Sequence, residues 1–385
     1  SIHAVSVFES NVLDLVQLFT RQRFEPLPGK RLRILMLNWR DTKHTWAGGA
    51  EVYIHEIAKK WVKDGNTVTL FCGNDGHSPR NQIVDGIHTV RRGGFYTVYL
   101  WAFLYYIFRY RKTYDVIIDC ENGIPFFTPL YVRKPIVLLI HHVHQDVFRA
   151  HLRFPLSLIA MFMESKLMPM LYRSKSIVTV SDSSKQEIIK LDLGDQASIT
   201  VVNPGVDTLA YTRAVKTSHP SFIYVGRLKP YKQIDIAIKA FARIHTIFSK
   251  ATFSIVGEGE SMPDLVLLVK KLGIGKSVIF YGKVSDEQKS LLLSQSWVAV
   301  QPSQIEGWGI TVIEANACGT PVVASNVSGL RDSIVQGSTG ILVHKKRIDE
   351  FAKAMAEFIV DDTYRKLLSE GAHLWSQNFT WQKSA

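Results

Sequence analysis

The 385-residue sequence lacks most features of secreted, zinc-finger and membrane-spanning proteins. Its three cysteines, Cys72, Cys120 and Cys318, have unrelated spacings, which excludes a disulfide framework and a zinc pattern and favours a reducing compartment. No apolar run reaches the roughly 18 to 20 residues that cross a bilayer, and the N-terminus has no secretory signal pattern. We therefore expect a cytoplasmic protein. The sequence begins at Ser1, so a processed or trimmed end also stays open.

Two phosphate-binding fingerprints are also missing. The sequence contains neither the G-x-G-x-x-G pattern nor a Walker P-loop, which argues against a dehydrogenase and a P-loop ATPase. The composition, 46% hydrophobic and 21% charged, predicts an ordinary globular protein, and the length allows two domains with separate cores. The formal charge of +12 is spread over both halves and favours an anionic partner, such as nucleotide phosphate, acidic lipid or nucleic acid.

Short β-rich runs alternate with helix-length segments in two sets. Continuous apolar strands separated by helices indicate parallel sheets that are covered on both faces. We therefore predict an α/β fold of two doubly wound, Rossmann-like domains with a cleft between them, where ligands bind beyond the carboxyl ends of the strands. The expected strands are 31–39, 67–73, 115–120, 135–141, 176–181 and 199–203, then 221–227, 251–257, 277–282, 297–303, 321–325 and 340–343.

The same pattern predicts the domain boundaries. We expect an N-terminal extension over 1–29, a first domain over 30–205 and a second domain over 206–370. Residues 371–385 would begin a C-terminal helix that crosses back to the first domain.

Two carboxylates, Glu306 and Glu314, lie in a largely apolar stretch that follows an expected strand. Glu306 falls in the expected loop and Glu314 in the helix after it. The amides of Gly309, Ile310 and Thr311 at the helix start would form an anion site between them. Carboxylates that accept hydroxyl hydrogen bonds on either side of a phosphate site suit a nucleotide sugar. The alternative is a pair of solvated glutamates, but a carboxylate is rarely buried without a partner.

The stretch Glu306-Gly-Trp-Gly-Ile-Thr-Val-Ile-Glu314 resembles the E-x7-E signature of retaining glycosyltransferases of the GT-B fold, family 4 (glycosyl transferases group 1). Residues 221–232 resemble the family's strand and loop in which an arginine and a lysine, here Arg227 and Lys232, clamp the donor diphosphate. Fixed cations there would stabilise the charge of the departing diphosphate. The resemblance is strong over 221–343 and looser from 31 to 207.

The N-terminal half carries weaker signals of the same kind. Gly48-Gly49 resembles the family's glycine loop that faces the donor phosphates, although a plain turn is the alternative. His141 ends an expected strand and matches the family's histidine that reaches the transferred sugar. The histidines of 141–144 have no carboxylate at a known metal spacing, and Asp119-Cys-Glu121 is expected to be structural, so no metal site is predicted.

The resemblance implies a nucleotide-sugar donor, UDP- or GDP-linked, and metal-independent transfer with retention by front-face substitution. It further implies that Glu306 holds sugar hydroxyls and Glu314 the ribose. There are departures from the family pattern: Trp308 replaces a usual phenylalanine, and Asn203-Pro-Gly-Val-Asp207 replaces Pro-Asn-Gly-Val-Asp. Residues 1–29 have no counterpart, and the last helix stops early.

Residues 91–112 carry the signal that bears on the acceptor. They combine five basic residues, no acidic residue and a dense aromatic core. This apolar stretch is too short to span a bilayer but long enough to lie in its surface. Two interpretations stay open. The segment is either a buried helix with solvated basic ends or a peripheral contact with anionic membrane, where a lipid-linked or cell-envelope glycan acceptor would be met.

Other functions also stay open. A nucleotide-sugar epimerase or a disaccharide-forming synthase of the same fold would need no membrane. A basic regulatory protein that binds nucleic acid or nucleotides is supported by the charge alone, because no RNA-binding or helix-turn-helix motif is present. We therefore predict a nucleotide-sugar donor and a glycan acceptor as partners, and no nucleic acid.

Overall fold

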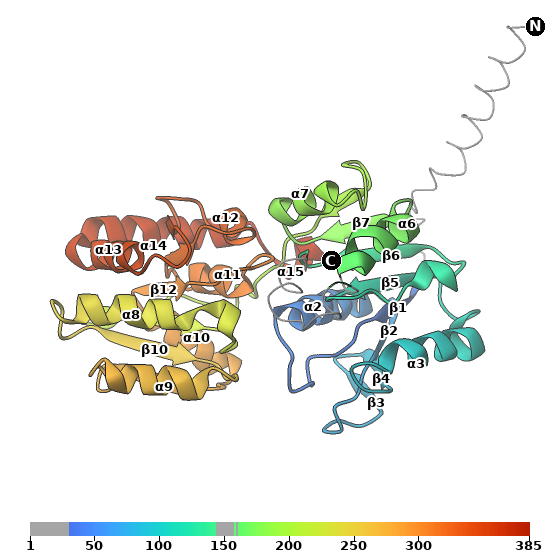
Figure 1. Cartoon of the computed structure of the whole chain (residues 1–385), viewed down its shortest axis with the longest axis horizontal. Helices are drawn as coiled ribbons and strands as arrows, with labels where there is room; N and C mark the ends of the chain where they lie inside the picture. The colour runs from blue at the N-terminus through green and yellow to red at the C-terminus, as the bar shows by residue number, and fades with distance from the viewer. Residues whose placement is uncertain (1–30, 144–157, 159–160) are drawn as a thin grey trace, which may run out of the picture. The chain divides into compact units, whose positions relative to one another are not determined.

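We describe a computed structural model of the chain over residues 31–143, 158 and 161–385 (Figure 1). The predicted extension 1–29 lies outside these residues, and so does His144. The described chain divides into two compact units. The first contains the residues up to Asp41 together with Trp61–Val178 and Ile188–Thr200, and the second contains Thr42–Lys60, Thr179–Glu187 and Val201–Ala385.

The N-terminal half forms a sheet in the order β3-β4-β2-β1-β5-β6-β7-β8. The pairings of β1 with β2 and β5, of β2 with β4 and of β5 with β6 are parallel, as the continuous apolar runs predicted. The strands are β1 (Arg33–Leu37), β2 (Thr67–Cys72), β3 (Asn81–Val84), β4 (Ile87–Arg91), β5 (Val116–Glu121), β6 (Ile136–Ile140), β7 (Ser176–Thr179) and β8 (Ile199–Val201).

The C-terminal half forms a parallel sheet in the order β11-β10-β9-β12-β13-β14. The two sheets confirm the predicted fold class of two doubly wound α/β domains, and each expected strand overlaps an observed one. The strands are β9 (Ser221–Val225), β10 (Thr252–Val256), β11 (Val278–Gly282), β12 (Val298–Gln301), β13 (Val322–Ser325) and β14 (Gly340–Val343).

Helices of the C-terminal half form two groups. In one, α8 (Ile234–His245) packs against α9 (Met262–Lys271) and α13 (Ile348–Val360). In the other, α11 (Ile310–Ala317) packs against α10 (Asp286–Gln295) and α14 (Asp362–Ser376). Phenylalanines from β9, β10, α8 and α13 belong to one buried core cluster, and burying each contributes about 1.5 to 3 kcal/mol. The fully buried ones are Phe222, Phe241, Phe253, Phe351 and Phe358.

The remaining helices are shorter or lie in the N-terminal half. No helix of the described part is both long enough and apolar enough to cross a membrane. The shorter or N-terminal helices are α2 (Gly49–Lys63), α3 (Val98–Tyr105), α6 (Met168–Tyr172), α7 (Asp182–Lys190), α12 (Leu330–Ser333) and α15 (Trp381–Ser384).

The antiparallel hairpin of β3 and β4 was not predicted from the sequence. Its turn is Asp85-Gly86, with φ values of +49° and +80°. Two consecutive residues with positive φ give the tight turn that Asp-Gly favours between alternating strands. The dipeptide is therefore the local signal for this hairpin, because neither strand is a continuous apolar run.

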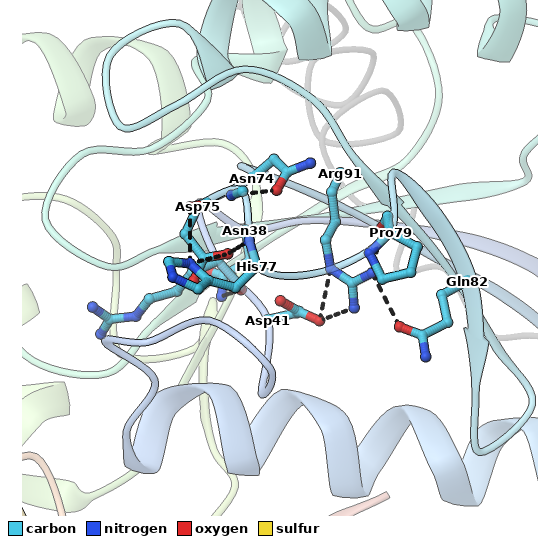
Figure 2. A network of polar contacts seen from close by, with 10 residues as sticks. Asn38, Asp41, Asn74, Asp75, His77, Pro79, Gln82 and Arg91 are labelled. Carbon is cyan, nitrogen blue, oxygen red and sulfur yellow. Dashed lines mark hydrogen bonds and ion pairs between the residues drawn. The ribbon is translucent and has the colours of Figure 1, made fainter.

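A buried ion pair joins β4 to the chain that follows β1 (Figure 2). Nη2 of Arg91 donates to Oδ2 of Asp41 at 2.5 Å, and its Nη1 donates to the carbonyl of Pro79 at 2.7 Å. Arg91 is 1% exposed and Asp41 is 4% exposed. The interpretation of residues 91–112 as a helix with solvated basic ends is therefore wrong at Arg91, because a carboxylate 50 residues earlier compensates its charge.

The strand order predicts a ligand site at the carboxyl edge of each sheet. The order in which successive strands are added to the sheet reverses between β1 and β5 in the first sheet and between β9 and β12 in the second, although both pairs are parallel. Ligands of such sheets bind beyond the carboxyl ends of the strands at these switch points. In the second sheet, the loop after β9 begins at Gly226-Arg227 and the loop after β12 contains Glu306.

Candidate active site

Arg227 lies two residues after the end of β9, so the strand holds its backbone near the carboxyl edge of the sheet. Its Nη2 donates to the hydroxyl of Tyr231 at 2.9 Å. Burial disfavours the charged guanidinium, but Tyr231 and Glu51 oppose this effect, and the pKa of Arg227 is raised. Arg227 is therefore a permanent cation at the switch point. Tyr231, which orients it, was not predicted as a site residue.

Lys232 ends a short 3-10 turn, Pro230–Lys232, in the same loop. Its Nζ lies 2.6 Å from Oε1 and 2.9 Å from Oε2 of Glu306. Burial disfavours the ammonium, but the combined effects of Glu306 and Tyr231 oppose it, and the pKa of Lys232 is raised. The loops after β9 and β12 thus bring a predicted donor-binding cation and a predicted catalytic carboxylate into direct contact.

The helix α11 begins at Ile310, where the sequence predicted it, and ends at Ala317. The preceding Gly309 has φ +88°, a left-handed conformation that side chains rarely adopt, and a Cβ there would lie 3.0 Å from Leu330. Glycine is thus required at this entry. The amides of Ile310 and Thr311 in the first turn have no partner within the helix. They point a partial positive charge out of the helix start.

Glu314 lies one turn further along α11 and is 7% exposed. Its Oε1 accepts a hydrogen bond from Nζ of Lys289 at 3.0 Å, while its Oε2 is buried and has no hydrogen-bond partner among the described residues. Burial opposes the charge of Lys289, but Glu314 and Tyr211 raise its pKa. Glu314 is therefore not a solvated helix-face residue. Its partner on α10 was not predicted.

Gly48 and Gly49 lie at the start of α2, in the part of it that belongs to the second unit. The amide of Gly48 donates to Oε2 of Glu51 at 2.7 Å, which caps the helix. A Cβ on Gly48 would lie 3.1 Å from Cζ of Arg227. The glycine therefore permits a close approach of backbone and guanidinium, and its role toward a donor stays a prediction.

His141 follows β6 directly and is 8% exposed. It belongs to the first unit, whereas Glu306 belongs to the second. Its role toward a sugar stays a prediction.

Asp119 lies in β5 and is fully buried. It accepts hydrogen bonds from the hydroxyls of Tyr172 at 2.5 Å and Thr128 at 2.7 Å, and from the amide of Phe126 at 2.9 Å. Burial raises the pKa of Asp119, while these donors oppose the shift. The carboxylate is structural, as predicted. No cluster of metal-ligating side chains occurs within the described residues.

The segment Asn203–Asp207 contacts the end of the chain. Val206 pairs with Thr380 in a short parallel bridge, and the hydroxyl of Ser384 donates to the carbonyl of Asn203 at 2.7 Å. Trp308, the substitute for the usual phenylalanine, stacks edge-on against Phe379 with ring centroids 5.0 Å apart. The residues 371–376 belong to α14, which already begins at Asp362.

Two protein-family models match consecutive parts of the chain. The model for "Glycosyltransferase Family 4" matches residues 47–209, and the model for "Glycosyl transferases group 1" matches residues 212–375. The second match contains every residue of the site that lies in the loops after β9 and β12 and on α11.

Relatives with curated names match about half of the chain. A glycogen synthase of Mycobacterium tuberculosis is 30% identical over 216 residues, which is 55% of this chain and 52% of the relative. A D-inositol 3-phosphate glycosyltransferase of Mycolicibacterium smegmatis is 32% identical over 216 residues, 53% of this chain and 49% of the relative. The chain thus spans about half the length of the curated relatives it matches.

Solved structures match nearly the whole chain at low identity. Sucrose-phosphate synthase from Thermosynechococcus elongatus has a TM-score of 0.78 at 19% identity, over 92% of this chain and 96% of that one. Anabaena Alr3699/HepE in complex with UDP-glucose has a TM-score of 0.72 at 20% identity, over 92% and 97%. WaaG, a glycosyltransferase involved in lipopolysaccharide biosynthesis, has a TM-score of 0.72 at 15% identity, over 89% and 95%. These similarities establish the fold.

Proposed function

Because the chain belongs to the group 1 glycosyltransferases of the GT-B fold, we propose that it transfers a hexose-type sugar from a nucleotide donor to a hydroxyl acceptor with retention of configuration. The observation that supports this proposal is the gathering of two cations and two carboxylates at one switch point. Arg227 and Lys232 follow β9, Glu306 follows β12, and Glu314 lies on α11. Strands β9 and β12 are hydrogen-bonded neighbours.

The donor would be held by charge and by open hydrogen-bonding groups. Arg227, Lys232 and the first amides of α11 would bind the diphosphate, since fixed cations and a helix start favour phosphate. The unpaired Oε2 of Glu314 would accept a hydrogen bond from a ribose hydroxyl. Glu306 would accept hydrogen bonds from the sugar once phosphate competes for Lys232. A UDP donor is the first choice to test, because Alr3699/HepE, of the same fold, binds UDP-glucose.

The proposed step is a substitution on one face of the sugar. The acceptor oxygen forms a bond to the anomeric carbon as the bond from that carbon to the phosphate oxygen breaks. The leaving phosphate oxygen takes the proton of the acceptor hydroxyl, so no protein base is consumed. Arg227 and Lys232 would stabilise the charge that gathers on the diphosphate. We assign His141 to the transferred sugar because it follows β6 directly, as the corresponding histidine of the family follows its strand. We expect transfer to continue in the presence of EDTA.

For the acceptor, we propose a lipid-linked or cell-envelope glycan precursor that the protein meets in peripheral contact with an anionic membrane. The support is the basic and aromatic segment 91–112, whose Leu100, Phe103 and Phe108 are exposed. WaaG, which shares the fold, is involved in lipopolysaccharide biosynthesis.

The first experiment is thermal stabilisation of the protein by UDP, GDP, ADP and NAD. A ligand at about 100 times its dissociation constant adds roughly 2.7 kcal/mol to the free energy of unfolding, which is readily seen as a melting shift. We expect UDP to stabilise the protein and Arg227→Ala to abolish the shift. Arg243→Ala is the matched control, because Arg243 is exposed and pairs with Asp349 on the surface.

Stabilisation by NAD or nucleic acid instead of any sugar-carrying nucleotide would contradict the proposal. A second assay separates the nearest alternatives. With UDP-glucose as donor and no acceptor, an epimerase would still convert the donor, whereas a transferase would leave it largely intact because closure of such sites excludes water.

A further inference from the structure

The segment 91–112 is anchored in the core along one side only. The helix α3 and the π-helical turn Tyr106–Tyr110 bury Val98, Ala102 and Tyr106. Phe108 is 79% exposed and Leu100 is 58% exposed. Neither interpretation from the sequence is therefore complete, because the same helical segment contributes to the core and presents large apolar side chains on the surface.

A cleft of about 730 Å³ lies at the C-terminal end of this segment. It forms between residues 106–112 and residues 129–134, which lead into β6. Leu130, on the second wall, is 67% exposed. Each wall contributes two cations, which are Arg111 and Lys112 on one side and Arg133 and Lys134 on the other.

The four cations of this cleft lack carboxylate partners among the described residues. Two exposed arginines elsewhere in the same unit do have carboxylate partners: Arg33 pairs with Asp115 at 3.0 Å, and Arg173 pairs with Asp192 at 3.0 Å. Four uncompensated positive charges around one hollow attract anions more strongly than the same charges spread over a surface. The cleft therefore suits a phosphate group that is attached to something apolar.

We infer that this cleft binds the phosphate headgroup of an anionic phospholipid, with Phe108 and Leu130 inserted beside it into the membrane surface. The inference rests on the proposed use of a membrane acceptor and gives that contact a defined site. Lysine and arginine bind phosphate oxygens by charge-assisted hydrogen bonds. Exposed apolar side chains next to a basic cluster are typical of proteins that lie on a bilayer. A free phosphate ion would make no use of Phe108 and Leu130.

The test is flotation of the full chain with vesicles of phosphatidylcholine alone and vesicles that also contain phosphatidylglycerol. We expect binding to the anionic vesicles only, with loss of binding as salt screens the charges. The double variant Lys112→Gln and Lys134→Gln should bind roughly 30-fold more weakly, because each basic residue near the surface contributes about a fivefold factor. Its matched control is Lys63→Gln and Lys190→Gln, which removes the same charge from exposed lysines outside the cleft.

A second pair of variants tests the apolar part. Leu130→Ser should weaken vesicle binding, while Ile247→Ser, which changes a 76% exposed residue of the second unit, should not. Inorganic phosphate at the same anion concentration should compete poorly with vesicles. The inference would be overturned if the cleft variant and its lysine control lost vesicle binding equally. Efficient competition by free phosphate would also overturn it.

Other results would also decide against it. If the chain is a dimer without vesicles and Phe108→Ser makes it a monomer, the cleft is an interface between copies. Stabilisation by UDP is measured in parallel, because the lysine variant should keep it. If UDP does not stabilise the unaltered chain, the proposed function fails. If UDP stabilises it but anionic vesicles do not bind, only the membrane inference fails.

Discussion

Nζ of Lys232 lies within hydrogen-bonding distance of both carboxylate oxygens of Glu306, at 2.6 and 2.9 Å. The two side chains are 12% and 15% exposed, so water screens their attraction little. In this state the cation that should hold the diphosphate is neutralised by the carboxylate that should hold the sugar. A donor that enters the site would therefore have to exchange this ion pair for its own phosphate and hydroxyl groups.

This exchange predicts opposite effects of Glu306→Gln on binding and on transfer. UDP should bind at least as tightly as before, because the amide competes less with phosphate for Lys232. Sugar transfer should fall by roughly 10- to 100-fold, since hydrogen bonds to a charged group contribute about 1.5 to 3 kcal/mol. The measurements are UDP binding by calorimetry and the initial rate of transfer. Weaker UDP binding by Glu306→Gln would mean that the pair is a binding unit rather than a competitor.

The pair of Lys289 and Glu314 predicts a strong coupling in stability. Lys289→Met should destabilise the protein by about 3 kcal/mol, because it leaves the carboxylate of Glu314 buried without its cation. The double variant Lys289→Met and Glu314→Gln should recover most of this loss. Urea unfolding of the single and double variants measures the coupling. Additive effects would show that the 3.0 Å contact contributes little.

These two pairs illustrate what the sequence could and could not predict. The expected strands overlap the observed ones because continuous apolar runs depend only on neighbouring residues. The start of α11 was predicted because Gly309 and the following residues carry local signals. Lys289 was not identified as the partner of Glu314, because the pair depends on how α10 packs against α11, 25 residues away in sequence. The basic cleft was missed for the same reason, since its second wall, 129–134, has no motif of its own.

The buried pair of Arg91 and Asp41 predicts a structural cost that a surface pair would not show. Asp41→Asn should destabilise the protein by about 3 kcal/mol, because the guanidinium of Arg91 stays buried without a counter-charge. Asp115→Asn is the control, since its partner Arg33 is 50% exposed and such pairs contribute less than about 1 kcal/mol. Thermal unfolding of both variants gives the comparison. Similar losses would mean that the hydrogen bonds of Arg91 to Pro79 and Gln82 suffice.

Lys216 predicts a dependence of stability on pH. Burial lowers the pKa of its ammonium from 10.5 to about 7, and the guanidinium groups of Arg213 and Arg365 add to the shift. Between these two pH values the unfolded chain binds a proton that the folded chain does not, so the free energy of unfolding from this group rises with pH. Below about pH 7 both states carry the charge, and the folded state bears the full cost of burying it.

Lys216→Met removes this cost, so its effect on stability should be more favourable at about pH 6 than at about pH 10. The loss of the 2.6 Å hydrogen bond to Thr320 shifts both values but leaves their difference. Denaturant unfolding at the two pH values, with exposed Lys353→Met as control, measures that difference, and equal effects at both would exclude a lowered pKa.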